Sequence, residues 1–126
     1  MGENSAPGYV NKPDHAVSAA PFSGRVAVLL GGKVVVDTRS ALQVEETGHG
    51  MVFYFPKADI RMDLAVAGDA TSYCPFKGQA SYHTFVAGGR RSENAAWSYD
   101  APYDEALALK DHLAFYPNRV DAIRVE

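Results

Sequence analysis

A pair of glycines between two runs of β-branched residues is the feature that most constrains how this chain of 126 residues can fold. Residues 25–30 (RVAVLL) and 33–37 (KVVVD) favour extended backbone, and Gly31-Gly32 between them can adopt the positive φ angles that a two-residue hairpin turn requires. Gly88-Gly89 is a second hairpin signal, after the alternating run 79–86. The sequence therefore predicts antiparallel β-hairpins.

Other short segments are predicted to be strands because they are apolar and aromatic, or because apolar and polar residues alternate in them. Residues 51–55 (MVFYF) are an apolar run that ends at Pro56, and residues 60–64 (IRMDL) alternate, which is typical of a half-buried strand. The remaining predicted strands are residues 42–46, 95–99, 112–116 and 120–125. Turns are expected at residues 48–50, 68–69 and 117–118.

One short helix is predicted at residues 100–109, where Asp100 can act as the cap and Pro102 suits the first turn. The fold class expected from all these elements is mainly β, with a small folded-over antiparallel sheet or a partly open barrel. We expect a single β-rich domain in residues 23–126. Residues 1–22 show little periodicity and are expected to form an N-terminal arm or tail.

Composition and charge argue against several classes of function. The formal net charge of −3 argues against a nucleic-acid partner, which normally needs clustered Lys and Arg. No apolar run reaches about 18 residues, and the start of the chain lacks a signal-peptide pattern, so we expect a cytoplasmic protein with no membrane partner. The single cysteine excludes an internal disulfide and a four-cysteine zinc site, and the histidines are scattered, so we expect no metal and no cofactor.

Several distinctive blocks follow one another along the chain. They are Val34–Asp37, Glu46, Tyr54–Pro56, the motif Cys-Pro-aromatic-Lys-Gly-x-Ala-x-Tyr at residues 74–82, Ala96–Tyr99 and Ala114–Tyr116. With these blocks the chain resembles domain-of-unknown-function family 427 over roughly residues 15–125. The resemblance implies a small β fold of the Mss4-like or β-tent kind. It conveys no established activity, although the family is sometimes labelled nucleotidyltransferase-like.

Nucleotidyl transfer would need carboxylates that hold Mg²⁺ beside the phosphates of a substrate. The chain has neither a P-loop nor a Gly-Ser followed by an Asp-x-Asp pair. Glu45 and Glu46 are adjacent, and adjacent residues of a strand face opposite sides, so both cannot enter one site. The residues therefore argue against this activity. Glu46, which belongs to the family pattern, is expected either to face a pocket or to form a salt bridge with Lys77.

Cys74 and Lys77 lie in a Pro- and Gly-containing turn that leads into a strand. A nearby cation can activate a thiol, so one hypothesis makes Cys74 a catalytic nucleophile or redox group with Lys77 as its activator. The other hypothesis is that Cys74 packs as a small, inert apolar residue. Whether the protein is an enzyme stays open at this point.

A ligand pocket is the preferred functional hypothesis, because Tyr and Trp combine an apolar ring with a hydrogen-bonding group. The predicted ligand-binding residues are Glu46, Tyr54, Asp63, Lys77, Tyr82, Trp97 and Tyr99. In this hypothesis Lys77 binds the negative charge of a small polar or anionic molecule, while Glu46 and Asp63 accept hydrogen bonds. Two alternatives remain. The rings could simply pack in the core, or the protein could be an interaction module that forms homo-oligomers through exposed sheet edges.

Overall fold

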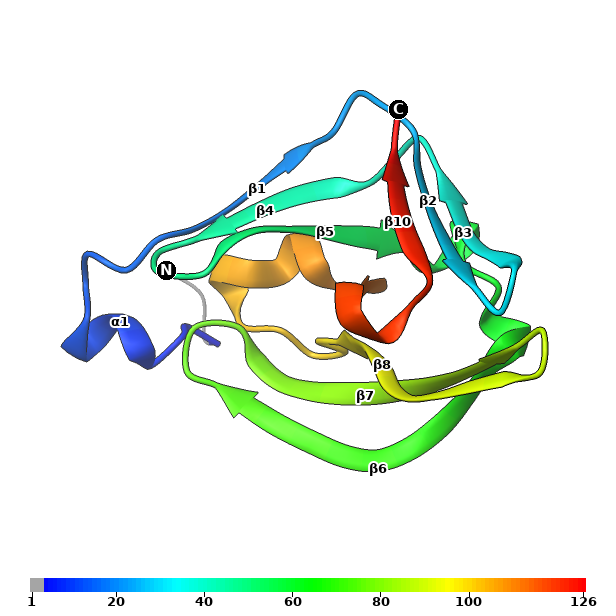
Figure 1. Cartoon of the computed structure of the whole chain (residues 1–126). Helices are drawn as coiled ribbons and strands as arrows, with labels where there is room; N and C mark the ends of the chain where they lie inside the picture. Colours follow the sequence, from blue (N-terminus) through cyan, green and yellow to red (C-terminus); the bar gives the residue numbers. More distant parts are fainter. Residues whose placement is uncertain (1–3) are drawn as a thin grey trace.

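A computed structural model describes residues 4–126, in which antiparallel strands form two sheets (Figure 1). The larger sheet has the strand order β1-β4-β5-β9-β8-β7-β6, and the smaller sheet has the order β10-β2-β3. The strands are β1 (Val17–Pro21), β2 (Val26–Leu30), β3 (Lys33–Thr38), β4 (Leu42–Glu46), β5 (Gly50–Pro56), β6 (Ala65–Cys74), β7 (Gly78–Ala87), β8 (Arg90–Ser98), β9 (His112–Phe115) and β10 (Ala122–Val125).

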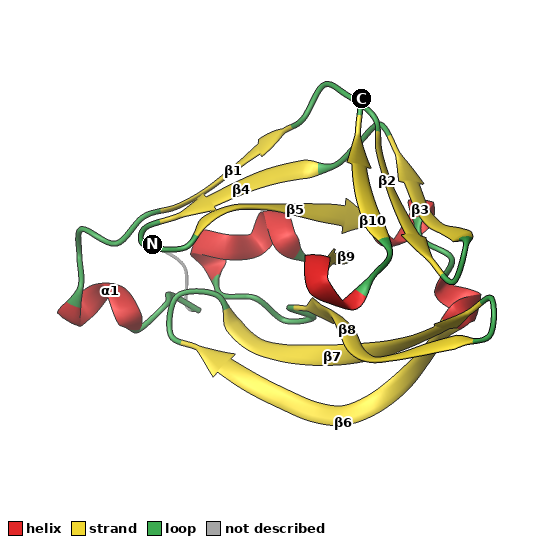
Figure 2. Ribbon diagram, in the orientation of Figure 1, coloured by secondary structure: helices red, strands yellow, loops and turns green. Residues whose placement is uncertain are grey.

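The larger sheet folds over itself (Figures 1 and 2). β1, β4 and β5 form one layer, and β6, β7 and β8 form the opposite layer. β9 connects the layers because it pairs with β5 on one side and with β8 on the other. The mainly β prediction is confirmed, and within the described residues the strands do not close into a barrel, since β1 and β6 remain the two edges of the sheet.

Both predicted glycine turns are present, and they touch each other. Gly31 and Gly32 have φ angles of 58° and 74°, and Gly88 and Gly89 have φ angles of 56° and 81°. A Cβ atom on Gly31 would lie 1.9 Å from the carbonyl oxygen of Ala87, and one on Gly88 would lie 1.8 Å from the carbonyl oxygen of Gly31. The close backbone approach therefore joins the β2–β3 hairpin of the smaller sheet to the β7–β8 hairpin of the larger one.

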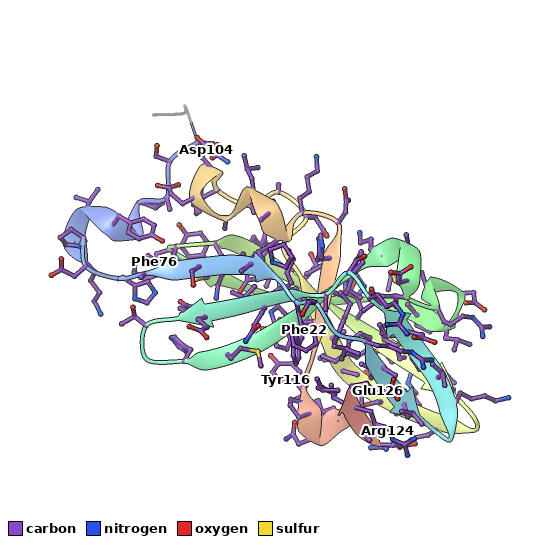
Figure 3. All side chains as sticks on the ribbon, turned by 90° about the horizontal axis from the view of Figure 1, so that it is seen from above. Phe22, Phe76, Asp104, Tyr116, Arg124 and Glu126 are labelled. Atoms are coloured by element: carbon purple, nitrogen blue, oxygen red, sulfur yellow. The ribbon has the colours of Figure 1, made fainter. Side chains whose placement is uncertain are left out.

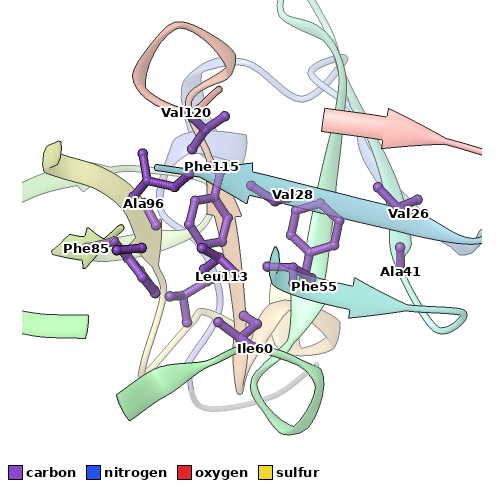
Figure 4. Close-up of a cluster of buried hydrophobic side chains, with 14 residues drawn as sticks. Val26, Val28, Ala41, Phe55, Ile60, Phe85, Ala96, Leu113, Phe115 and Val120 are labelled. Carbon is purple, nitrogen blue, oxygen red and sulfur yellow. The ribbon is translucent and has the colours of Figure 1, made fainter. Parts of the chain in front are cut away.

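The main hydrophobic core lies where the two sheets meet (Figure 4). Val26 and Val28 of β2 pack in one cluster with Phe55 of β5 and with Leu113 and Phe115 of β9. A second, separate cluster contains Val44, Tyr54, Ala80, Tyr99, Ala106, Leu109 and Ala114. Two of its members are tyrosines, so this part of the interior also contains hydroxyl groups.

The N-terminal segment makes specific contacts with the rest of the chain. The backbone N–H of Ala6 donates to Glu105 Oε1 at 2.8 Å, and that of Gly8 donates to the Pro75 carbonyl at 3.0 Å. The short helix α1 (Gly8–Asn11) follows, and Phe76 lies beside it (Figure 3). β1 then pairs with β4, so residues from this segment form one edge of the larger sheet.

The predicted strand at residues 60–64 is wrong. Only Ile60 forms a bridge, to Val36, and two 3-10 helices, Lys57–Asp59 and Met62–Leu64, flank it. Ile60 is buried and Asp63 is exposed, so the half-buried pattern that the alternation predicts is present without a strand. Alternation over five residues does not identify a strand here, because a strand needs a partner along its length.

Three other predictions differ from the structure in detail. Gly68-Asp69 lies inside β6 at a register shift rather than in a turn, because glycine also accommodates a bulge. β8 begins at Arg90, five residues before the strand predicted there. The predicted helix is a 3-10 helix, Asp104–Leu109, with an interruption at Ala106.

None of the helices in residues 4–126 is long and apolar enough to cross a membrane.

The contact between the two turns predicts a difference between neighbouring glycines. At Gly32 no atom lies within 4 Å of the position that a Cβ atom would take. Gly32→Ala should therefore lower the free energy of unfolding by only about 1–2 kcal/mol, which is the cost of placing a residue other than glycine in the left-handed conformation. Gly31→Ala adds a collision with the Ala87 backbone and should lower the free energy of unfolding by about 3 kcal/mol or more. Urea denaturation of both variants measures the difference, and equal losses would contradict a tight contact.

Candidate functional site

A cleft of about 340 Å³ opens between the two layers of the larger sheet. Its lining comes from Val44, Glu46, His49, Gly50, Val52, Tyr54, Cys74, Lys77, Tyr82, Trp97, Tyr99 and Tyr116. The structure thus brings together every predicted site residue except Asp63. Asp63 lies outside the cleft, where its exposed carboxylate pairs with Arg61 at 2.7 Å.

Local backbone geometry directs several of these side chains into the cleft. At the β6–β7 turn the N–H of Lys77 donates to the Cys74 carbonyl at 3.3 Å, and Gly78 follows with a φ angle of 124°. This is the compact turn that the Cys-Pro-Phe-Lys-Gly sequence predicts. Tyr82 and Trp97 stand directly opposite each other on β7 and β8, so their side chains share one face of the sheet.

An ionic cluster is centred on Glu46, in the lining of the cleft. Lys77 Nζ donates to Glu46 Oε1, and His15 Nε2 lies 2.8 Å from Glu46 Oε2. His49 Nε2 lies 4.0 Å from the same Oε2 atom. The side chains of Glu46 and Lys77 are only 9% and 12% exposed, so this is a largely buried pair rather than a surface salt bridge. Glu46 thus forms the salt bridge with Lys77 and also lines the cleft.

Two opposing effects set the pKa of Glu46. Burial favours the neutral acid and by itself would raise the pKa. Hydrogen bonds from Lys77 and His15, together with the charges of Lys77 and His49, outweigh burial and hold the pKa below its ordinary value. Glu46 is therefore a carboxylate at neutral pH, and both of its oxygens are engaged by neighbouring side chains.

Aromatic rings form the walls of the cleft. The Trp97 indole N–H donates to the Tyr54 hydroxyl at 3.0 Å, and the Trp97 ring lies 4.4 Å from the Tyr116 ring, centroid to centroid, at an angle of 42°. The Lys77 ammonium lies 5.6 Å from the centroid of the Tyr99 ring, within reach of a cation–π contact. Tyr82 is held by a hydrogen bond of 2.8 Å between its hydroxyl and Ser72 Oγ.

Burial disfavours ionisation of two tyrosine hydroxyls, those of Tyr54 and Tyr99. Desolvation raises the pKa of Tyr54 and of Tyr99 well above the ordinary tyrosine value. Tyr54 is also influenced by its hydrogen bond from Trp97, which acts in the opposite direction but is the smaller effect. At neutral pH both side chains therefore carry an O–H group that can donate a hydrogen bond.

Residues from the N-terminal segment contact residues of the cleft and of the β6–β7 turn. The sequence did not indicate these contacts. The His15 ring stacks on Phe76 with centroids 3.8 Å apart and an interplanar angle of 18°. Tyr9 packs against Phe76 edge to face at 5.0 Å. His15 has no recognisable motif around it, so no local signal indicates that it bonds to Glu46. His49, between two glycines, likewise enters the site only through the folding of its loop.

The described residues offer no obvious metal site, since no group of three or more metal-ligating side chains occurs within residues 4–126. The chemistry available in the cleft is instead hydrogen bonding, one ammonium group, one thiol and several aromatic faces. This combination suits the binding of a small molecule that has both a polar and an apolar part.

Comparison with known protein families gives a match over most of the chain. The model of a protein family described as a domain of unknown function (DUF427) matches residues 18–126. None of the curated proteins that were compared with the chain matches it.

The Glu46 cluster predicts a specific pH dependence of stability. Because the folded pKa of Glu46 is lowered, its carboxylate stabilises the fold above its ordinary pKa of 4.5. This contribution is lost as the pH falls through the lower folded value. The melting temperature of the unmodified protein should therefore fall more steeply below about pH 5 than that of Glu46→Gln.

At neutral pH, Glu46→Gln should cost about 2–4 kcal/mol of stability, because it leaves the Lys77 ammonium largely buried without its counterion. Glu45→Gln is the matched control, since Glu45 is the exposed neighbour on the same strand. The stability of Glu45→Gln at neutral pH, and the fall of its melting temperature at acidic pH, should match those of the unmodified protein. Parallel melting curves for Glu46→Gln and the unmodified protein across acidic pH would contradict the role of this carboxylate.

Proposed function

The chain belongs to the DUF427 family, and because that description assigns no activity, we propose from the geometry of the cleft that the protein binds a small polar or anionic molecule. The observation that supports this most is the convergence of side chains from β4, β5, the β6–β7 turn, β7 and β8 on one open cleft. Its volume of about 340 Å³ falls within the range of small-molecule pockets.

In this proposal Lys77 binds the polar or anionic group of the ligand. The ammonium donates to Glu46, and its other N–H groups remain for a ligand. Glu46 positions Lys77 in this proposal, because Lys77 and His15 each engage one of its carboxylate oxygens. Trp97 and Tyr82 form apolar walls against which the rest of the molecule packs.

A thermal-shift screen tests ligand binding directly. Nucleotides, sugars and small organic acids should include compounds that raise the melting temperature, since a ligand at 100 times its Kd adds about 2.7 kcal/mol of stability. Binding should also change the fluorescence of Trp97, the only tryptophan. The double variant Glu46→Gln/Lys77→Gln keeps the pair neutral and should lose the shift, whereas Lys110→Gln, at an exposed lysine, should retain it. No shift with any compound would contradict the proposal.

A second candidate function is that of a thiol-dependent enzyme, because Cys74 lines the same cleft. The activating cation of that hypothesis is Lys77, but Glu46 already pairs with this ammonium. Cys74 is also partly buried and belongs to the edge of the second hydrophobic cluster. The contacts therefore favour packing over catalysis.

Alkylation distinguishes these two roles of Cys74. We expect iodoacetamide to modify the folded protein more slowly than the urea-unfolded protein at neutral pH, because burial restricts access to the thiol. Mass spectrometry measures the modified fraction over time, and Cys74→Ser is the control for reaction at other side chains. Faster reaction in the folded state would instead support the enzyme.

A further inference from the structure

Hydrogen-bonding capacity in the cleft is unequal between donors and acceptors. The carboxylate of Glu46 is the strongest acceptor in the lining, and Lys77 and His15 engage its two oxygens. The ammonium of Lys77 has three N–H groups, and its bond to Glu46 uses one of them. The cleft therefore has charged N–H donors available beside a carboxylate whose two oxygens each already accept from a neighbouring side chain.

Two tyrosine hydroxyls add to these donors. The Tyr54 oxygen accepts from Trp97, and its own O–H donates no hydrogen bond to another residue in the range 4–126. The Tyr99 hydroxyl has no hydrogen bond to any described residue, although the side chain lines the cleft and the residue is only 7% exposed. Every fully buried side-chain N or O atom of the described residues has a partner. The Tyr99 oxygen is therefore open to solvent rather than sealed in the core.

The side chains that carry these donors line the same cleft. The Lys77 ammonium is 5.6 Å from the centroid of the Tyr99 ring. Tyr54 and Tyr99 belong to the same cluster of buried side chains. Donors from β5, the β6–β7 turn and the segment after β8 thus line the same cleft, which Trp97 also lines. Such a set complements an oxygen anion that takes several hydrogen bonds.

The charges of Glu46 and Lys77 limit how much negative charge the anion can carry. Glu46 neutralises Lys77, so one additional negative charge can share the ammonium, whereas a dianion would be repelled by the nearby carboxylate. The aromatic side chains of the lining, which include Trp97 and Tyr116, favour a flat ring as the apolar part. Building on the proposed ligand-binding function, we infer that the ligand is a small aromatic monocarboxylate, whose carboxylate accepts from Lys77, Tyr54 and Tyr99 while its ring packs on Trp97.

Matched probes test this inference with the full chain. Benzoate, benzamide, benzylammonium, phenyl phosphate and cyclohexanecarboxylate share a similar size and differ in charge or in planarity. Calorimetric titration and the NMR shift of the Trp97 indole N–H measure their binding. Benzoate should bind most tightly, by about tenfold over benzamide, because the amide lacks the charge that strengthens the hydrogen bonds. Phenyl phosphate and cyclohexanecarboxylate should bind more weakly than benzoate.

Tyr99→Phe is the decisive variant. Its hydroxyl has no partner among the described residues, so its removal should leave the melting temperature unchanged while weakening benzoate binding about tenfold. Tyr73→Phe is the matched control, because the Tyr73 hydroxyl bonds to Tyr103 outside the cleft, and it should bind benzoate normally. Unchanged benzoate affinity in Tyr99→Phe would overturn the assigned carboxylate contact.

The outcomes separate the ligand class from the broader function. Equal or tighter binding of benzamide, benzylammonium or phenyl phosphate would overturn the monocarboxylate inference and leave ligand binding in the cleft intact. If all five probes fail to bind but the broad screen gives a hit that depends on Lys77, the monocarboxylate inference is likewise overturned and ligand binding in the cleft stands. Failure of the probes and of the broad screen together would overturn both proposals.

Discussion

The largely buried pair of Glu46 and Lys77 is the interaction on which the cleft depends. Glu46 ends β4 in one layer of the folded sheet, and Lys77 belongs to the turn between β6 and β7 in the other layer. Their contact therefore spans the opening between the layers. Removing one partner would leave a charge without compensation in a poorly solvated place, which makes the pair a strong constraint on how the layers approach.

The N-terminal segment completes this arrangement from outside the cleft. His15 bonds to the second oxygen of Glu46 and stacks on Phe76, two residues from Cys74 along the turn. Backbone bonds to Glu105 and Pro75 hold the segment in place. The Glu46 carboxylate, the β6–β7 turn and the stack of His15 on Phe76 are thus connected by contacts. The position of Lys77 therefore depends on residues that themselves lie outside the binding surface.

The aromatic residues of the site serve packing and binding at the same time. Tyr54 is 2% exposed and belongs to a hydrophobic cluster, yet its hydroxyl accepts from Trp97 at the cleft. Core packing and a ligand wall, which the sequence presents as alternatives, are therefore two faces of the same side chains. The amphipathic structure of tyrosine makes this possible, because its ring and its hydroxyl can occupy different environments.

The sequence by itself determined the local structure: the Gly31-Gly32 and Gly88-Gly89 turns and most of the strands, because backbone preference and side-chain alternation act over a few residues. It also indicated most of the residues of the cleft, through the turn motif and the resemblance to a family. Only the tertiary structure decided that Asp63 lies elsewhere and that His15 bonds to Glu46. These outcomes follow from which strands pair across the fold, and especially from β9 joining β5 to β8, and such long-range pairing leaves no local pattern in the chain.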